Sequence, residues 1–197
     1  TTDFVNVPDS EAFDISSAIT VACWAKSDLA DLPGGSFYTL VAKFSRDDNK
    51  REWALFLSEQ EQVRLRVTED GTQGAGQWWD WTADDAIIPN EWRHYAFTFN
   101  AGVFVIYVDG VAVSATDAQT NTGSSFYNDN VPVTIGARYN DYATNEKEYF
   151  FDGDIDEVRI YNTALTARQI KDLYIGGTGF RGRYQSGYRR NYRARYK

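Results

Sequence analysis

The chain has 197 residues, of which 43% are hydrophobic and 16% aromatic, and it carries a formal net charge of −8. A chain of this length and aromatic content can bury a full hydrophobic core as one domain, which excludes a disordered or low-complexity protein. The single cysteine, Cys23, excludes an intrachain disulfide and a cysteine-based zinc site, and no apolar run approaches the roughly 18 residues that a membrane span needs.

Short segments rich in Val, Ile, Phe, Tyr and Thr follow one another along most of the chain. They alternate hydrophobic and polar residues and are separated by turn residues, which is typical of an antiparallel β-sandwich. Asp109-Gly110 lies between two such segments and predicts a tight hairpin, because both turn residues adopt a positive φ. The predicted strands are residues 3–7, 18–26, 39–44, 53–57, 63–67, 92–99, 103–108, 111–115, 131–137 and 153–161.

One helix is predicted, close to the C-terminus. Thr166 can cap a helix over residues 167–174, and Gly176 can end it in the left-handed conformation. We therefore predict a folded body over residues 1–175 and a separate C-terminal arm over residues 176–197. The start of the chain has neither a basic nor an apolar leader segment, so we expect no signal peptide in it.

Five sequence motifs point to a known family. They cover residues 3–26, 40–43, 89–96, 107–110 and 151–166, and the last of them contains the run Phe151-Asp152-Gly153-Asp154-Ile155-Asp156. In this order they resemble the laminin G-like, concanavalin A-like lectin/glucanase jelly-roll domains. The resemblance implies an all-β fold, a two-sheet antiparallel β-sandwich with one short C-terminal helix, to which this chain adds an extended basic arm. Function is less constrained, because the fold hosts lectins, adhesion modules, glycanases and structural proteins.

Catalysis is not expected. Glycanases of this fold place two carboxylates on one strand in the pattern Glu, one residue, Asp, one or two residues, Glu, and the sequence contains no such run. Glu59 and Glu61 are two apart, but we place them in a turn. His94 is the only histidine and lies on a predicted strand, where a core or sheet-surface role is expected instead of a metal site or a catalytic triad.

Asp156 is the candidate metal ligand. It shares strand parity with Val158 and Ile160, which predicts that its carboxylate points into the core. A buried carboxylate is costly unless it is paired or bound to a metal. The resemblance implies a structural calcium ion held by an acid of this strand together with N-terminal carbonyls. The alternative is an aspartate that accepts hydrogen bonds from backbone N–H groups or an arginine.

Aromatic residues near flexible loops are candidates for glycan binding. Trp78, Trp79 and Trp81 follow the glycine-rich residues 70–76 and could stack on sugar rings, although a place in the core is the alternative for at least one face of this strand. Tyr127 belongs to a polar loop, residues 121–130, that could form a binding rim.

The last 22 residues are basic and aromatic. All 28 acidic residues lie at or before Asp172, whereas this segment holds 7 of the 20 basic residues. Its aromatic residues recur every four positions, which places them on one face of an extended strand, so we expect it to dock on the sandwich, a sister subunit or a partner. The aromatic residues are Phe180, Tyr184, Tyr188, Tyr192 and Tyr196, and the arginines are Arg181, Arg183, Arg189, Arg190, Arg193 and Arg195.

These features favour a non-catalytic structural or attachment subunit of a larger assembly, in the first place a phage capsid decoration or fibre protein at the virion surface. The alternative is a glycan-binding or adhesion module of an extracellular protein. A third hypothesis takes the arm as a nucleic-acid binder, which the acidic body opposes through charge repulsion.

Overall fold

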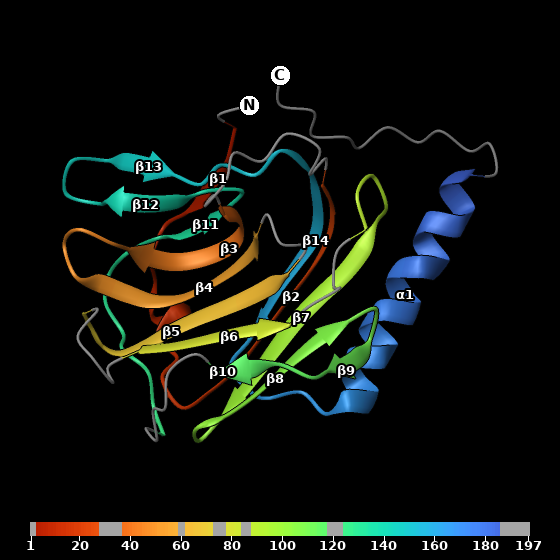
Figure 1. The fold of residues 1–197 in the computed structure, drawn as a ribbon, viewed down its shortest axis with the longest axis horizontal. Helices are drawn as coiled ribbons and strands as arrows, with labels where there is room; N and C mark the ends of the chain where they lie inside the picture. The colour runs from red at the N-terminus through yellow and green to blue at the C-terminus, as the bar shows by residue number, and fades with distance from the viewer. Residues whose placement is uncertain are drawn as a thin grey trace.

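The computed structural model describes residues 3–27, 37–58, 62–72, 78–83, 88–117 and 124–185, and it describes only the backbone for residues 78–81, 117 and 177–185. Two β-sheets pack face to face (Figure 1), which confirms the predicted antiparallel sandwich. All ten predicted strands are present in the structure. The described residues also form four strands that were not predicted: β6 (Trp78–Ala83), β10 (Thr116–Asp117), β12 (Arg138–Asp141) and β13 (Glu146–Glu148).

The larger sheet has nine strands in the described part of the chain. Its main path runs β1-β11-β3-β4-β5-β6-β10, and the β12–β13 hairpin extends it beside β3. The bounds are β1 (Val5–Val7), β3 (Phe37–Ser45), β4 (Lys50–Ser58), β5 (Val63–Gly71), β6 (Trp78–Ala83), β10 (Thr116–Asp117), β11 (Val133–Ile135), β12 (Arg138–Asp141) and β13 (Glu146–Glu148).

The smaller sheet has the order β14-β2-β7-β8-β9. Its strands are β2 (Ala18–Ser27), β7 (Arg93–Asn100), β8 (Val103–Val108), β9 (Val111–Val113) and β14 (Gly153–Tyr161). The Asp109-Gly110 hairpin between β8 and β9 is confirmed, with φ values of 50° and 73°. A Cβ at Gly110 would also lie 2.9 Å from Lys171 Cδ, so both the turn and the packed helix require glycine here.

The core fills the space between the two sheets. β5 shows how the alternating sequence builds it, since Val63, Leu65 and Val67 are buried while Arg64 and Arg66 are half-exposed on the other face. Across the core, the ring of Trp53 lies 6.1 Å from that of Phe97. A short 3₁₀ helix, η1 (Glu11–Phe13), follows β1.

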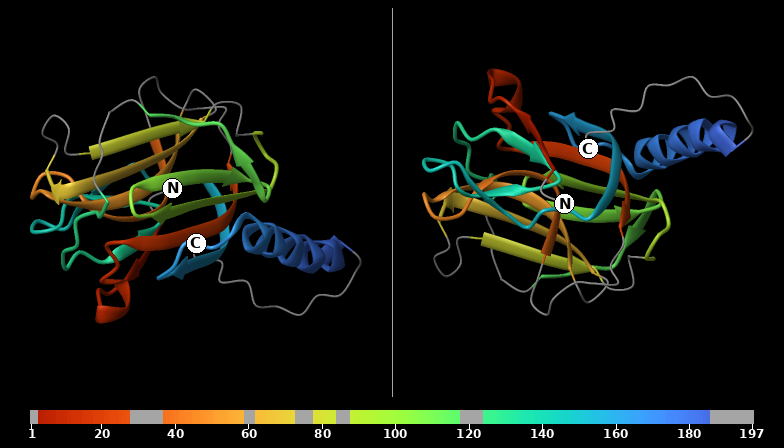
Figure 2. Two further views of the ribbon diagram at one scale, coloured as in Figure 1. Left: turned by 90° about the horizontal axis from the view of Figure 1, so that it is seen from below. Right: turned by 90° about the horizontal axis from the view of Figure 1, so that it is seen from above.

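The helix α1 (Ala167–Gln185) covers the outer face of the smaller sheet and projects beyond it (Figure 2). Ile170 is fully buried against Ala22, Ala96 and Tyr107, and the Tyr174 ring stacks on Trp24 at 5.6 Å. The predicted cap at Thr166 is confirmed.

The prediction that Gly176 ends this helix is wrong, because α1 continues to Gln185. Glycine weakens a helix by about 1 kcal/mol without blocking its hydrogen bonds, and residues 176–185 contain no proline. The first half of the predicted extended arm, with Phe180, Arg181, Arg183 and Tyr184, is therefore helical. The rest lies outside the described residues: Tyr188, Arg189, Arg190, Tyr192, Arg193, Arg195 and Tyr196.

Candidate functional site

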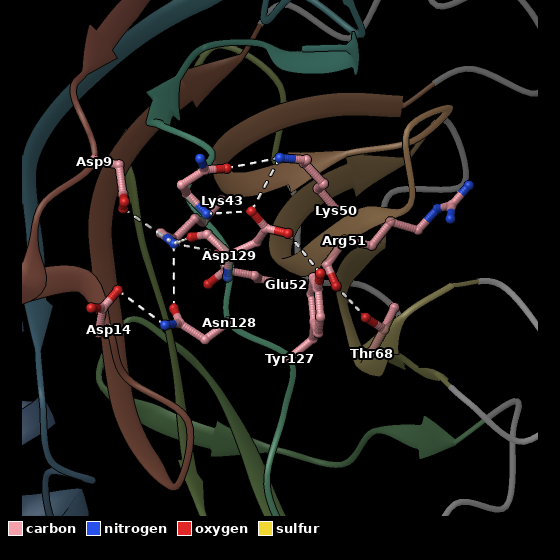
Figure 3. Close-up of polar contacts among 11 residues, drawn as sticks. Asp9, Asp14, Lys43, Lys50, Arg51, Glu52, Thr68, Tyr127, Asn128 and Asp129 are labelled. Carbon is pink, nitrogen blue, oxygen red and sulfur yellow. Dashed lines mark hydrogen bonds and ion pairs between the residues drawn. The ribbon is translucent and has the colours of Figure 1, made fainter. Parts of the chain in front are cut away.

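A cluster of polar side chains lies where residues 124–132 pass the ends of β4 and β5 (Figure 3). Its members come from segments far apart in the sequence. They belong to the segment after β1, to β3, to β4 and to the loop before β11: Asp9, Asp14, Lys43, Lys50, Glu52, Tyr127, Asn128, Asp129 and Asn130.

The Lys43 ammonium is the centre of the buried part. The side chain is fully buried and is surrounded by oxygen atoms. Nζ donates to Glu52 Oε1 and to the Asp129 carbonyl, and it lies 3.4 Å from Asn128 Oδ1 and 3.3 Å from Asp9 Oδ1. A buried ammonium is stable only with such pairing. Lys43 therefore ties the loop and the segment after β1 to β4.

Glu52 is equally buried, and its Oε1 also accepts the Asp129 N–H at 2.9 Å. Burial raises the pKa of Glu52 to about 8, although the nearby Lys43 ammonium acts in the opposite direction. Desolvation outweighs the ion pair here because the carboxylate has lost its water entirely.

The solvent-facing part of the cluster is organised around Asp129. Its Oδ2 accepts the Tyr127 hydroxyl at 2.6 Å, and its Oδ1 accepts the Lys50 ammonium at 3.1 Å and the Asn130 N–H at 2.6 Å. Partial burial alone would raise the pKa of Asp129, but these donors together hold it below its ordinary value. The same hydrogen bond to Asp129 raises the pKa of Tyr127 to about 12.

Tyr127 is held in place from three sides. Its N–H donates to the Thr68 carbonyl at 2.8 Å, and its hydroxyl is bound to Asp129. A Cβ at Gly71 would lie 2.7 Å from the ring, so the ring packs directly on the Gly71 backbone. The preceding Phe126 is buried in the core. The half-exposed ring of Tyr127 is thus fixed before any ligand arrives.

Trp78, Trp79 and Trp81 lie on β6, which was not among the predicted strands. Trp78 pairs with Thr68, Trp79 with Val67 and Trp81 with Leu65. The backbone of Thr68 therefore contacts two of the predicted ligand-binding residues, Trp78 and Tyr127. The side chains of the three tryptophans lie outside the described residues, so their role in stacking stays a prediction.

The inward orientation predicted for Asp156 is wrong. A β-bulge between Asp156 and Arg159, where Glu157 has a φ of 50°, shifts the alternation along β14. Asp156 is exposed, and its Oδ1 accepts the Glu157 N–H at 2.8 Å, whereas Val158 packs on the core. An exposed carboxylate does not fit a metal ligand of the core.

In the described ranges, no group of three or more His, Cys, Asp or Glu side chains could hold a metal ion. Calcium binding itself stays a prediction.

His94 is buried between the smaller sheet and α1, in keeping with the expected core or sheet-surface role. It is 2% exposed, and its ring lies 5.5 Å from Trp24 and 6.2 Å from Tyr174. Glu59 and Glu61 lie outside the described residues. None of the helical segments in the described part of the chain combines the length and the apolar character that a membrane crossing requires.

Sequence reasoning missed Lys43, Glu52 and Asp129. Lys43 carries the one available signal, because it is a charged residue in the otherwise apolar run Leu40-Val41-Ala42-Lys43-Phe44 and must find a partner if that strand is buried. Nothing in the sequence around Asp129 identifies it as that partner.

Residues 1–171 match the family model of the concanavalin A-like lectin/glucanases superfamily. The chain belongs to this family. Rat (Rattus norvegicus) usherin is 25% identical over 171 residues, which are 87% of this chain and only 3% of usherin. The match confirms the resemblance drawn from the five motifs and identifies a lectin-like sandwich.

Three solved structures share the fold. One is a Bacteroides ovatus protein described as carbohydrate-binding, with 20% identity and a TM-score of 0.60 over 86% of this chain and 44% of that one. Another is the CBM40 domain of Ruminococcus gnavus IT-sialidase bound to α2,3-sialyllactose, with 11% identity and a TM-score of 0.63. The match covers 88% of this chain and 94% of that one. The third is domain 4 of the Geobacillus stearothermophilus arabinanase AbnA in complex with arabinotriose, with 23% identity and a TM-score of 0.54. The match covers 87% of this chain and 72% of that one.

Proposed function

We propose that this chain is a non-catalytic carbohydrate-binding domain of an extracellular protein and that it binds a glycan at the rim formed by Tyr127, Asp129, Lys50 and Asn130. The observation that carries the proposal is the fixed, half-exposed Tyr127 ring beside a carboxylate, an ammonium and an amide. A pyranose ring offers an apolar C–H face to an aromatic ring and hydroxyl groups to such polar partners.

The rim is rigid in the free protein, which favours binding. The hydrogen bonds of Asp129 and the packing of Tyr127 on Gly71 fix the side chains that a sugar would contact. Binding then costs less conformational entropy than it would on a loose loop. The relatives that share the fold include domains solved with sialyllactose and with arabinotriose, which supports a sugar as the ligand class.

The cluster is poorly suited to glycoside hydrolysis. Hydrolysis needs two carboxyl groups that both reach the sugar. Glu52 is fully buried, and its Oε1 is bound to Lys43 and to the Asp129 N–H. The other carboxylates of the cluster each face a donor of the cluster itself: Asp129 faces Tyr127 and Lys50, Asp9 faces Lys43, and Asp14 accepts the Asn128 amide. We therefore expect the cluster to bind a sugar without cleaving it.

The test is a glycan array followed by calorimetry with the best ligand. We expect Tyr127→Ala to lower the affinity by about tenfold or more, because a buried aromatic contact of this kind is worth about 2 kcal/mol. Tyr161→Ala, on β14 of the other sheet, is the matched control and should keep the parent affinity. A parent that binds no glycan, or equal losses in both variants, would contradict the proposal.

The attachment role in a larger assembly, including a virion surface, stays a prediction. It rests on the composition of the C-terminal segment, whose last 12 residues lie outside the described ones. Co-purification of the chain with a particle tests it. A salt-dependent mobility shift with DNA or RNA tests the nucleic-acid hypothesis.

A further inference from the structure

An apolar groove opens on the side of the sandwich where both sheets end. β1 is the edge strand of the larger sheet and β14 is the edge strand of the smaller one. Between them lies a groove of about 250 Å³, lined only by apolar side chains. Its lining residues are Val7, Phe13, Val133, Ile135, Val158 and Ile160.

The size and chemistry of the groove favour a peptide side chain. Pockets for small molecules usually enclose about 300–1,000 Å³ and contain several polar groups, whereas this groove is smaller and, among the described residues, is lined by no polar side chain. Phe4 and Val5, beside it, are 37% and 46% exposed. Among the described strands β14 pairs with β2 alone, so its other side can accept an added strand.

The outer face of β14 is acidic. Asp154 and Asp156 are exposed along it, Glu157 is half-exposed, and Asp152 just before the strand is also exposed. The one basic residue of the strand, Arg159, already lies 3.2 Å from Glu157. A strand that adds to this edge should therefore carry apolar side chains on one face and positive charges on the other.

Residues 186–197, with the sequence Ser-Gly-Tyr-Arg-Arg-Asn-Tyr-Arg-Ala-Arg-Tyr-Lys, have this pattern. Tyr188, Tyr192 and Tyr196 share one parity, so they would lie on one face of an extended strand. Arg189, Arg193 and Lys197 have the other parity and would lie on the opposite face. The segment contains five basic residues and no acid.

We propose that residues 186–197 of this chain add as a strand to the free edge of β14, with a tyrosine ring in the groove and the arginines against Asp154 and Asp156. Twelve extended residues reach about 40 Å, so the segment can bind β14 of its own chain or of a second copy. The proposed docking uses none of the residues of the proposed glycan-binding rim, because the groove is lined by residues of β1, η1, β11 and β14.

Disulfide cross-linking tests the position. Cys23, the only natural cysteine, is fully buried and will not compete. Asp154→Cys is combined with Arg193→Cys in the full chain, because both side chains would lie on the outer face, and Val111→Cys with Arg193→Cys is the matched control, since Val111 is exposed on β9, the opposite edge of the same sheet. We expect a cross-link at position 154 and none at position 111. Equal cross-linking at both positions, or none at either, would overturn the proposal.

Mixing two singly substituted chains identifies the source of the strand. A cross-link between the Asp154→Cys chain and the Arg193→Cys chain shows docking on a second copy, and a cross-link only within the doubly substituted chain shows docking on its own sheet. Hydrogen exchange gives a second readout: replacing Tyr188, Tyr192 and Tyr196 by serine should speed the exchange of β14 amides by about tenfold or more, while β9 is unchanged. Unaltered exchange along β14 would contradict the proposed strand.

Discussion

The Lys43 ammonium contacts the Glu52 carboxyl group inside the sandwich, and neither side chain has any exposed surface. The pair joins β3 to β4, and through the Asp129 backbone it also holds the loop that carries Tyr127. An interaction in the protein interior thus determines the shape of the proposed binding rim. Its energy depends on pH because Glu52 is titratable.

The free energy of unfolding should fall between about pH 4.5 and pH 8. Burial raises the pKa of Glu52 from 4.5 to about 8, so in this window the folded state keeps a proton that the unfolded state releases. The resulting stability is complete below about pH 4.5 and is lost as the pH rises through the folded pKa, with a slope of at most about 1.4 kcal/mol per pH unit. Urea unfolding at several pH values measures it. Glu52→Gln should flatten the profile, and parallel profiles for the two proteins would argue against the raised pKa.

Gly71→Ala should destabilise the protein and weaken the rim. Gly71 has a φ of 79°, and an added Cβ would lie 2.3 Å from the Asn49 carbonyl oxygen and 2.7 Å from the Tyr127 ring. We expect a loss of about 1–3 kcal/mol by urea unfolding and weaker glycan binding. Gly176→Ala is the control: it lies in α1 with nothing within 4 Å, and alanine there should stabilise by up to about 1 kcal/mol. Equal effects of the two substitutions would refute this account.

Truncation after Ile175 should leave a folded sandwich. The α1 residues that pack on the smaller sheet, Ile170, Leu173 and Tyr174, all precede the cut, although it removes the second half of the helix. A cooperative melt by circular dichroism is the expected result. In the full chain, Ile170→Ala should cost about 2–5 kcal/mol, because Ile170 is fully buried. Aggregation of the truncated chain would show that residues 176–197 are needed for folding.

Asp156→Ala should lower stability only slightly. The carboxylate is exposed, and the hydrogen bond that it accepts from the Glu157 N–H at the β-bulge is worth about 1 kcal/mol or less. We expect the variant to lower the melting temperature by the same amount in calcium and in EDTA. If calcium stabilises the parent but not the variant, a metal ion binds at Asp156 and the geometry of the site must differ from the one described.

Most of the fold could be predicted from the sequence, because local patterns determine it. Alternating hydrophobic residues mark the core face of a strand such as β5, and Asp109-Gly110 has the positive φ values that a tight hairpin needs. The predicted cap at Thr166 has the same origin: its Oγ1 accepts the Gln169 N–H at 3.3 Å, within a single helical turn.

Only the tertiary structure determined the orientation of Asp156 and the partners of Lys43. A β-bulge moves Asp156 to the outer face of the smaller sheet. The bulge arises from the pairing of β14 with β2, so the alternation of residues within β14 does not reveal it. Lys43 meets Asn128 and Asp129 across 85 and 86 positions of the chain. Sequence patterns encode the periodicity of each strand, whereas these contacts depend on which strands and loops the topology brings together.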